Sequence, residues 1–321
     1  MAPLLYRLLI REMWKYLILI VALICLVIMN NHYYYYAFNL YRPSPEGSFR
    51  IMTYNTNGVS GEYEDSTFVE DFLLAVDSIL PQVLALQEMR EKYSPMLCEG
   101  LQQRFPYNSL VELEGSALKN KDAACLFSQF PIKSFFYTVY NRQELDSVYE
   151  VYDIASKARR YDEPPIYNAV LDVNGQETLV ICCYLKTNDY SQLRNKHSDR
   201  WLDGLDEYFK GYNVGSGVRS LNAEMMRDSI SRYDLPTIVC GDMNDFQYSR
   251  SVMALMGDDL KNVWWERGFG YGMTYNKYHL KIRIDHILMS KEIEAVSVDV
   301  PHLRFSDHYP IVADLKFCDD H

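Results

Sequence analysis

TIVCGDMND, residues 237–245, joins an apolar β-type run to a group of acidic and amide side chains. The apolar and β-branched residues at its start predict a buried strand. Asp242 and Asn244 occupy alternate positions after that run, so their side chains project to the same side if the strand geometry persists. The stretch therefore predicts a functional site at the point where a loop leaves a buried sheet.

Other apolar runs of the chain also end in a carboxylate, an amide or an imidazole. They are IMTYN with Asn55, VLALQE with Glu88, RIDHIL with Asp285, and SDHYPI with Asp307 and His308. A single Asp or Asn after a strand is usually a turn residue, because its side chain bonds the local backbone. Five such stretches in one order are hard to obtain by chance, so we expect these side chains to converge.

Ten β-type runs follow the first 48 residues, without an internal repeat. They lie at 49–54, 83–87, 123–127, 134–139, 167–173, 179–185, 237–240, 284–289, 295–300 and 311–317. So many strands with helices between them predict one α/β domain over 49–318, in which two sheets pack face to face under covering helices.

Three amphipathic stretches predict the covering helices. The first lies between the first two strands, where Thr67 and Glu70 have capping-box spacing. A second fits 219–233, and a third is expected within the polar insert at 188–217. This insert and the stretch 141–165 are expected to shape substrate access, as long loops often do.

Composition bounds the class of protein. The chain has 321 residues, 48% of them apolar and 23% charged, with a formal net charge of -11, so it can bury a large core. A non-specific nucleic-acid binder is more often basic, although a metal site can reverse the field that a phosphate meets locally. Short basic pairs such as Lys281 with Arg283 are expected to be solvated. The seven cysteines contain no C-x-x-C pair, which argues against a zinc site and favours buried free thiols.

The N-terminus carries the uncharged apolar run YLILIVALICLVIM, residues 16–29. Three cations precede it, and tyrosines at 33–36 follow it as an interfacial cluster. We expect 1–38 to be a cytoplasmic tip and a transmembrane signal anchor, 39–48 a linker, and the domain at 49–318 extracytoplasmic. A cleaved signal peptide is the alternative, although no small-x-small cleavage site is present.

The motifs taken together resemble the endonuclease/exonuclease/phosphatase superfamily, which includes DNase I-like nucleases, abasic-site endonucleases, inositol phosphatases and neutral sphingomyelinases. The resemblance rests on TYN, LQE, SQFPI, GDMND, RIDHI and SDHYPI, in that order, and spans 49–318. It implies a four-layer α/β sandwich, made of two mixed sheets flanked by helices. It also implies an active site at one edge of the sheets, with Mg²⁺ or Mn²⁺ as cofactor.

The metal site that the resemblance implies has hard oxygen ligands, which suit Mg²⁺. Glu88 is the expected ligand, with Asn55 beside it. Asp307 is expected to hold a metal-bound water or a second ion.

Four residues are expected to carry the chemistry. By resemblance, Asp242 orients or deprotonates the attacking water, and Asn244 donates a hydrogen bond to the developing charge. His308 acts either as general base or as an imidazolium bound to a phosphoryl oxygen, with Asp285 fixing its tautomer and raising its pKa. Which of Asp242 and His308 takes the proton stays open.

One position departs from the family pattern. Where relatives have an N-x-H-L strand end, this chain has CCYL, so Tyr184 replaces a histidine that binds phosphate in many relatives. A phenol donates a hydrogen bond but carries no positive charge near neutral pH, and Lys186 can supply the missing cation. Tyr184 remains a catalytic candidate, whereas Asp245, His286 and Arg219 are expected to be structural.

The predicted function is divalent-metal-dependent hydrolysis of a phosphoester bond by a monomer at the outer face of a membrane. Nucleic acid, phospholipid and sugar phosphate are the candidate substrates. The alternative is a binding module of the same fold, in which Tyr184 has weakened catalysis and a phosphate-bearing ligand is only held.

Overall fold

Two mixed six-stranded sheets form the centre of the structure. The structure is a computed structural model that describes residues 2–29, 44–57, 66–89, 95–109, 123–139, 141–152, 166–188, 201–277 and 280–318. The first sheet, in the order β13-β14-β1-β2-β4-β3, contains β1 (Phe49–Asn55), β2 (Val83–Met89), β3 (Tyr107–Asn108), β4 (Ala123–Ser128), β13 (Ile293–Asp299) and β14 (Ile311–Phe317). The second, in the order β5-β6-β7-β8-β12-β9, contains β5 (Ile132–Thr138), β6 (Ile166–Val173), β7 (Gln176–Tyr184), β8 (Thr237–Asp242), β9 (Leu260–Asn262) and β12 (Asp285–Ser290). A separate ribbon pairs β10 (Tyr275–Lys277) with β11 (Leu280–Ile282).

The two sheets share one apolar core. Ile51 and Val83 of the first sheet and Val180 and Ile238 of the second belong to the same buried cluster. Met52, the next residue along β1, belongs instead to a cluster on the outer face of the first sheet. Both faces of the central strands are therefore buried, as is usual for strands with a parallel neighbour.

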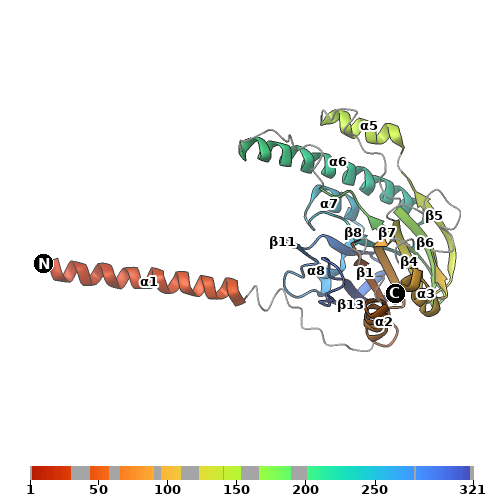
Figure 1. Ribbon diagram of the computed structural model, residues 1–321, viewed down its shortest axis with the longest axis horizontal. Coiled ribbons are helices and arrows are strands. Elements are labelled where there is room, and N and C mark those ends of the chain that lie inside the picture. Colours follow the sequence, from red (N-terminus) through yellow and green to blue (C-terminus); the bar gives the residue numbers. More distant parts are fainter. Residues whose placement is uncertain are drawn as a thin grey trace.

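Helices cover the outer faces of both sheets (Figure 1). The helices α2 (Ser66–Ile79) and α3 (Pro95–Arg104) share a buried cluster with the first sheet, and α6 (Trp201–Tyr233) and α7 (Arg250–Met256) share one with the second. The helix α5 (Arg142–Val151) packs on α6, and α8 (Val263–Arg267) follows β9. The predicted α/β fold with two mixed sheets flanked by helices is confirmed.

The helices differ most from the sequence-based expectation. Residues 201–217 of the insert and the stretch after it form the single helix α6, where the sequence predicts two helices, because buried Val214 and Val218 continue its apolar face onto α5. The helix α2 covers Ser66–Ile79, so Thr67 lies in its first turn. The stretch 141–165, expected to be a loop, begins with α5; residues 153–165 and 189–200 lie outside the described residues.

The N-terminal segment forms the helix α1 (Ala2–Met29) (Figure 1). Within the part of the chain that the structure describes, no helix has both the length and the apolar character to cross a membrane, and the predicted transmembrane helix is not found. Of the predicted linker, residues 44–48 are described. There Ser44 donates a hydrogen bond of 3.0 Å to Asp314 of β14, which joins the start of the domain to the first sheet.

Candidate active site

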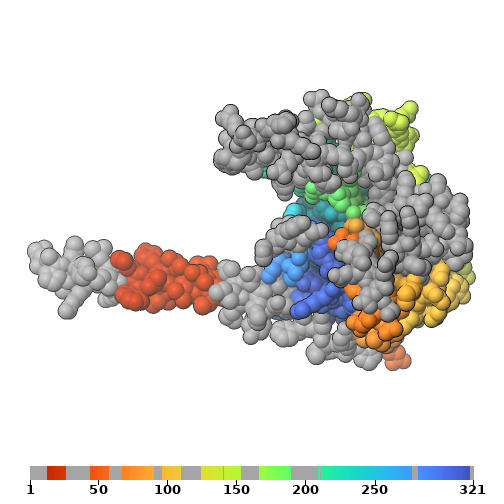
Figure 2. All heavy atoms as spheres, in the orientation of Figure 1, coloured from red at the N-terminus to blue at the C-terminus, as the bar shows by residue number. Residues whose placement is uncertain are grey.

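The ends of several strands bring the predicted site residues to one edge of the two sheets, called the site edge below. The strands β1 and β2 are parallel, as are β7 and β8, so Asn55, Glu88, Tyr184 and Asp242 all lie at or near carboxyl ends. The strand β12 is antiparallel to β8 and begins at this edge with Asp285, opposite Asp242. Figure 2 shows early, middle and late parts of the domain, coloured orange, cyan and blue, meeting in a hollow of the molecule.

Asn55 links the two sheets at the site edge. Its amide nitrogen donates to Glu88 Oε1 at 3.0 Å and to Asp242 Oδ2 at 2.8 Å. Its Oδ1 accepts a hydrogen bond of 2.8 Å from the backbone nitrogen of Asn57. Only the oxygen of an amide binds a cation, and this oxygen keeps a second lone pair beside the one that accepts from Asn57. In this arrangement Asn55 holds the two carboxylates together, and its role as a metal ligand stays a prediction.

Three of the six non-glycine residues with a positive φ angle in the described part of the chain lie at the site edge. Asn57, Glu88 and Asn244 have positive φ angles of 52°, 55° and 49°. Such conformations cost about 1–3 kcal/mol each and persist where the surrounding structure holds them, often at functional sites. At Glu88 the irregularity interrupts the pairing of β2 with β4 and directs the carboxylate towards Asn55.

The GDMND stretch turns as soon as β8 ends at Asp242. The backbone nitrogen of Asn244 donates to Asp242 Oδ1 at 2.8 Å, and its Nδ2 donates to Asp242 Oδ2 at 3.1 Å and to the carbonyl of Leu185 at 3.0 Å. The strand geometry does not persist to Asn244, because its positive φ turns the chain. The two side chains meet, but through this turn and not through strand alternation.

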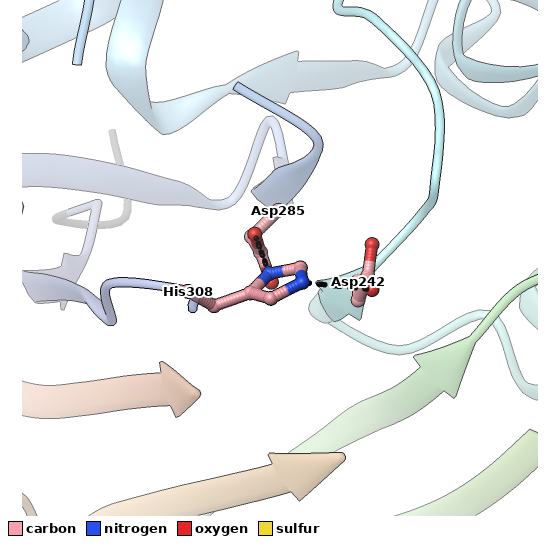
Figure 3. Close-up of side chains that lie close together, drawn as sticks. All are labelled: Asp242, Asp285 and His308. Carbon is pink, nitrogen blue, oxygen red and sulfur yellow. Dashed lines mark hydrogen bonds and ion pairs between the residues drawn. The ribbon is translucent and has the colours of Figure 1, made fainter. Parts of the chain in front are cut away.

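His308 lies between two carboxylates (Figure 3). Its Nδ1 is 2.9 Å from Asp285 Oδ2, and its Nε2 is 3.9 Å from Asp242 Oδ2. All three side chains are buried. The ring of Tyr275 packs edge-on against the imidazole, with 4.9 Å between ring centroids. The 3.9 Å between His308 Nε2 and Asp242 Oδ2 is too long for a hydrogen bond. An oxygen atom of a ligand, placed beside the line that joins these two atoms, can lie about 2.8 Å from both of them.

The pKa values at this cluster are shifted by burial and by charge. Burial disfavours the charged form of His308, but the charges of Asp285, Asp242 and Asp307 and the hydrogen bond that His308 donates to Asp285 outweigh it and raise the pKa of His308 to about 9. Burial, followed by the charge of Asp285, raises the pKa of Asp242 to about 7, against the opposing effect of His308. Near neutral pH the imidazole is therefore protonated, and Asp242 is close to its own titration point.

Two groups of residues are suited to a cation. Ligand atoms of Asp242, Asp285 and His308 lie within 4.8 Å of one another. A cation there must displace the proton of His308, since a ligating imidazole is neutral. Glu88 offers a half-buried carboxylate beside Asn55, with the hard oxygen donors that Mg²⁺ prefers. The residues present therefore fit a divalent cation, and Glu88 is the donor that leaves the His308–Asp285 pair intact.

The other two predicted residues, Tyr184 and Asp307, lie at the same edge. Tyr184 is the register partner of Asp242 in the parallel pair β7–β8, so both side chains face the same side of the sheet. It is half-buried. Asp307 is also half-buried, and its charge contributes to the raised pKa of His308. Its carbonyl accepts a hydrogen bond of 2.9 Å from the backbone nitrogen of Asn276.

A buried polar network lies behind the GDMND turn. Arg219 of α6 donates from Nε to Asp245 Oδ2 at 2.9 Å, and Ser251 donates to the same oxygen at 2.8 Å. His286 Nε2 is 3.0 Å from the carbonyl of Asp245. Burial is the first cause that lowers the pKa of His286 to about 4, so this imidazole is neutral. This placement agrees with the structural roles expected for Asp245, His286 and Arg219.

Thr274 is a site residue that the sequence does not single out. Its Oγ1 accepts hydrogen bonds from the backbone nitrogens of Ile284 and Asp285 at 3.2 and 3.1 Å, which fixes the start of β12. Its carbonyl accepts from the backbone nitrogen of Tyr309, next to His308. A lone threonine before a tyrosine gives no signal by itself, because its role depends on the path of the loop.

Comparisons with known proteins agree with the motifs and the fold. The model of the Endonuclease/Exonuclease/phosphatase family matches residues 227–308, which include GDMND, RIDHI and the triplet SDH. Among curated proteins, no sequence matches the chain.

Solved structures of low sequence identity have a similar fold. An endonuclease/exonuclease/phosphatase from Beutenbergia cavernae is similar with a TM-score of 0.57 and 16% identity, covering 85% of this chain and 72% of that one. A humanized D. rerio TDP2 carrying 14 mutations has a TM-score of 0.56 and 14% identity, covering 84% of this chain and all of that one. SmcL has a TM-score of 0.57 and 15% identity, covering 84% and 99%. At these identities the structural likeness shows the fold alone. The resemblance predicted from the motifs is thus confirmed: residues 227–308 match the Endonuclease/Exonuclease/phosphatase family, and the chain has the fold of solved structures of that superfamily.

Proposed function

We propose that this chain hydrolyses a phosphoester bond with the help of a divalent cation. The observation that carries the proposal is the continuous series of contacts Glu88–Asn55–Asp242–His308–Asp285 at the site edge, which joins residues of both sheets. A stability role alone does not account for it, because burying several carboxylates around one imidazole is costly without compensation. The family match over residues 227–308, which include Asp242, Asp285 and His308, also supports a phosphoester hydrolase.

The protonation states of Asp242 and His308 support different roles for the two residues in the reaction. A protonated His308, held by Asp285, donates from Nε2 to a phosphoryl oxygen and stabilises the charge that develops there. Asp242, with a pKa raised to about 7, accepts the proton of the attacking water. Asn244 holds Asp242 through two hydrogen bonds and fixes the direction of its carboxylate. The general base is thus Asp242, and His308 acts as the imidazolium.

The divalent cation, Mg²⁺ or Mn²⁺, would be held by Glu88, with Asp307 as a second carboxylate or as the holder of a bound water. When bound, it would supply Lewis-acid polarisation of the phosphoryl group. Asn55 positions Glu88 relative to Asp242.

The substrate class is open between nucleic acid, phospholipid and sugar phosphate. D. rerio TDP2, whose fold is similar with a TM-score of 0.55 at 13% identity, has been solved with a single-strand DNA product. That structure makes a phosphodiester of single-stranded DNA a substrate to test first. The chain is proposed to act as a monomer.

The test is release of product by the purified full chain and its Asp242→Ala variant on matched nucleic-acid, phospholipid and sugar-phosphate substrates with Mg²⁺. We expect turnover of one class and a loss of at least about 100-fold in the variant. The matched control is Asp228→Ala, which removes an exposed carboxylate from α6 and should retain the parent rate. Equal loss in both variants would argue against the assigned site.

The second candidate function, a phosphate-binding module, is favoured by Tyr184 alone. It predicts ligand binding without turnover on the whole panel. A Tyr184→His variant then gains little activity. A marked gain in that variant would instead show that the remaining site is competent and that the phenol limits the rate.

A membrane location is also a proposal. It is supported by the apolar side chains of α1 that are exposed in the structure, such as Trp14 (57%), Leu17 (47%) and Ile24 (51%). We propose that this surface holds the domain at the outer face of a membrane. Recovery of the full chain from cells in the soluble fraction, or protection of the domain from protease added to the outside of intact cells, would contradict it.

A further inference from the structure

The imidazole of His308 is held at one of its two nitrogens by a hydrogen bond. Its Nδ1 donates to Asp285 at 2.9 Å, which fixes one atom of the ring. The torsion that turns a histidine ring about its Cβ–Cγ bond has broad energy minima, so the rotamer alone fixes the ring plane only weakly. A second contact is therefore expected to decide whether Nε2 faces Asp242.

Tyr275, the first residue of β10, supplies such a contact. Its ring packs against the imidazole with 4.9 Å between the ring centroids and 64° between the ring planes. Tyr275 is half-buried and His308 is buried, so the two rings meet inside the site edge. Within the described residues, no other aromatic ring packs on this imidazole. An edge-on packing of two rings favours a defined angle between their planes, so it restrains the plane of the imidazole.

Backbone pairing places these two side chains opposite each other. Tyr275 and His308 form an antiparallel bridge. The backbones of 274–276 and 307–309 exchange two hydrogen bonds, of 2.9 and 2.6 Å, one on either side of the pair. In a bridge of this kind the two central residues exchange no backbone hydrogen bond with each other, and their side chains stand close together on one face. The contact between the rings therefore follows from the path of the backbone.

The segment 274–276 also fixes the carboxylate that binds His308. Oγ1 of Thr274 accepts hydrogen bonds from the backbone nitrogens of Ile284 and Asp285, at 3.2 and 3.1 Å. These bonds hold the start of β12, from which the carboxylate projects. The hydrogen-bond acceptor of the imidazole and the ring that packs on it therefore share one support.

We propose that Tyr275 is a positioning residue of the reaction: its ring holds the imidazole of His308 in the plane in which Nε2 faces Asp242. This inference rests on the proposed hydrolase function. The ring acts through His308 and does not itself touch the reacting atoms. Its effect belongs to the transition state, because the hydrogen bond from Nε2 strengthens as charge develops on the phosphoryl oxygen.

The first measurement is the steady-state kinetics of the full chain on the ester that it turns over. Tyr275→Ala should lower kcat roughly tenfold or more and leave KM within about twofold, because a misplaced imidazole weakens an interaction made only in the transition state. The matched control, Tyr107→Ala, removes an exposed tyrosine from β3 at the edge of the first sheet and should retain the parent kcat. The parent kcat in Tyr275→Ala, with or without a higher KM, would overturn the inference.

Tyr275→Phe separates the role of the ring from that of its hydroxyl. This variant should recover most of the kcat that Tyr275→Ala loses, since the ring that packs on the imidazole is retained. A phenylalanine variant as slow as the alanine variant would assign the role to the hydroxyl and overturn the inference. Should Tyr275→Ala fail to fold, Tyr275→Leu, which keeps apolar volume without a flat ring, replaces it in every comparison.

Crystal structures of the variants measure the orientation of the imidazole without turnover. In Tyr275→Ala the ring of His308 should be turned or occupy more than one orientation, whereas Tyr275→Phe should keep the 3.9 Å between Nε2 and Asp242 Oδ2. An imidazole that keeps the parent orientation in Tyr275→Ala would overturn the inference. If the imidazole turns but the parent hydrolyses no ester, the hydrolase function alone is refuted. If the parent is active and the imidazole does not turn, this inference alone is refuted.

Discussion

Asp242 and His308 show how single residues acquire unusual chemistry at the site edge. Burial raises the pKa of the carboxyl, and the charge of Asp285 raises it further, to about 7. Burial alone would lower the pKa of His308. The charge of Asp285 is the largest of the effects that oppose burial and raise this pKa to about 9. A group of three residues thus creates both an acceptor and a donor of protons near neutral pH.

The first prediction is a bell-shaped dependence of kcat/KM on pH. Activity should rise as pH passes about 7, where Asp242 loses its proton, and fall as pH passes about 9, where His308 loses its proton. Because Asp242 and His308 interact, the two apparent pKa values of this profile describe the pair and not either residue alone. Initial rates on a phosphodiester between pH 5 and 10 measure this profile.

Asp285→Asn is the control for that assignment. Without the charge of Asp285, burial should lower the pKa of His308, so the alkaline limb moves to lower pH. The carboxylate Asp258 is exposed, so Asp258→Asn should leave the profile in place. An alkaline limb that stays near pH 9 in the Asp285→Asn protein would assign it to another group.

Gly241 supports the second prediction. Its φ is +142°, and a Cβ there would lie 1.9 Å from the carbonyl oxygen of Cys183. Gly241→Ala should therefore destabilise the fold by roughly 3 kcal/mol or more, through strain and overpacking between β7 and β8. Gly175→Ala, at a positive φ but with open space around it, should cost only about 1 kcal/mol. Urea unfolding of both variants gives the comparison, and equal losses would contradict the steric argument.

At the residue scale, the sequence predicts which side chains reach the site edge but not all of their contacts. Every predicted residue lies there, because strand ends can be recognised from the apolar runs before them. The amide of Asn55 and the turn at Asn244 could not be predicted, since both depend on the second sheet. The basic pair Lys281 with Arg283 predicts a solvated arginine, but Arg283 is buried against Trp264, a contact that the sequence pattern does not reveal.

At the scale of elements, α6 contributes to the site through one buried ion pair. Arg219 and Asp245 are both fully buried in their side chains, and Arg219 also donates to the carbonyl of Lys186 and to Asn188. The helix thereby fixes both the GDMND turn and the segment that follows β7. Because the pair is buried, removal of one partner leaves an uncompensated charge.

The third prediction compares two ion pairs of the same helix. Arg219→Met should lower the free energy of unfolding by about 3–5 kcal/mol. Arg227→Met breaks a pair with Asp259 that is largely exposed and should cost less than about 1 kcal/mol. Chemical denaturation of the two variants and the parent measures both losses in the free energy of unfolding. Similar small losses would mean that Arg219 does not hold the turn.

Element boundaries show where sequence patterns stop being informative. The ten predicted strands all occur, because β-type runs of four to seven residues carry a clear pattern. The strands β3, β9, β10 and β11 have two or three residues and show no pattern of their own. Their pairing is determined by neighbours in the folded sheet.

At the scale of the whole molecule, the two sheets are organised in the same way. Each has a central parallel pair, β1–β2 in one and β7–β8 in the other, flanked by antiparallel strands. Packing the sheets face to face brings the carboxyl ends of both pairs to the site edge. The sequence predicts the two layers, but strand order depends on long-range pairing and could not be predicted.

The fourth prediction tests the central claim, that this convergence makes a divalent-metal-dependent phosphoester hydrolase. The measurement is the initial rate of phosphodiester hydrolysis by the full chain after chelation with EDTA and on return of Mg²⁺. We predict no turnover in the chelated protein and recovery when Mg²⁺ is added back. In the Glu88→Gln protein, the Mg²⁺ concentration that gives half-maximal activity should be roughly tenfold or more above that of the parent, since a ligating oxygen is lost. A rate that is unaffected by chelation, or a Glu88→Gln protein with the parent's Mg²⁺ dependence, would contradict the account.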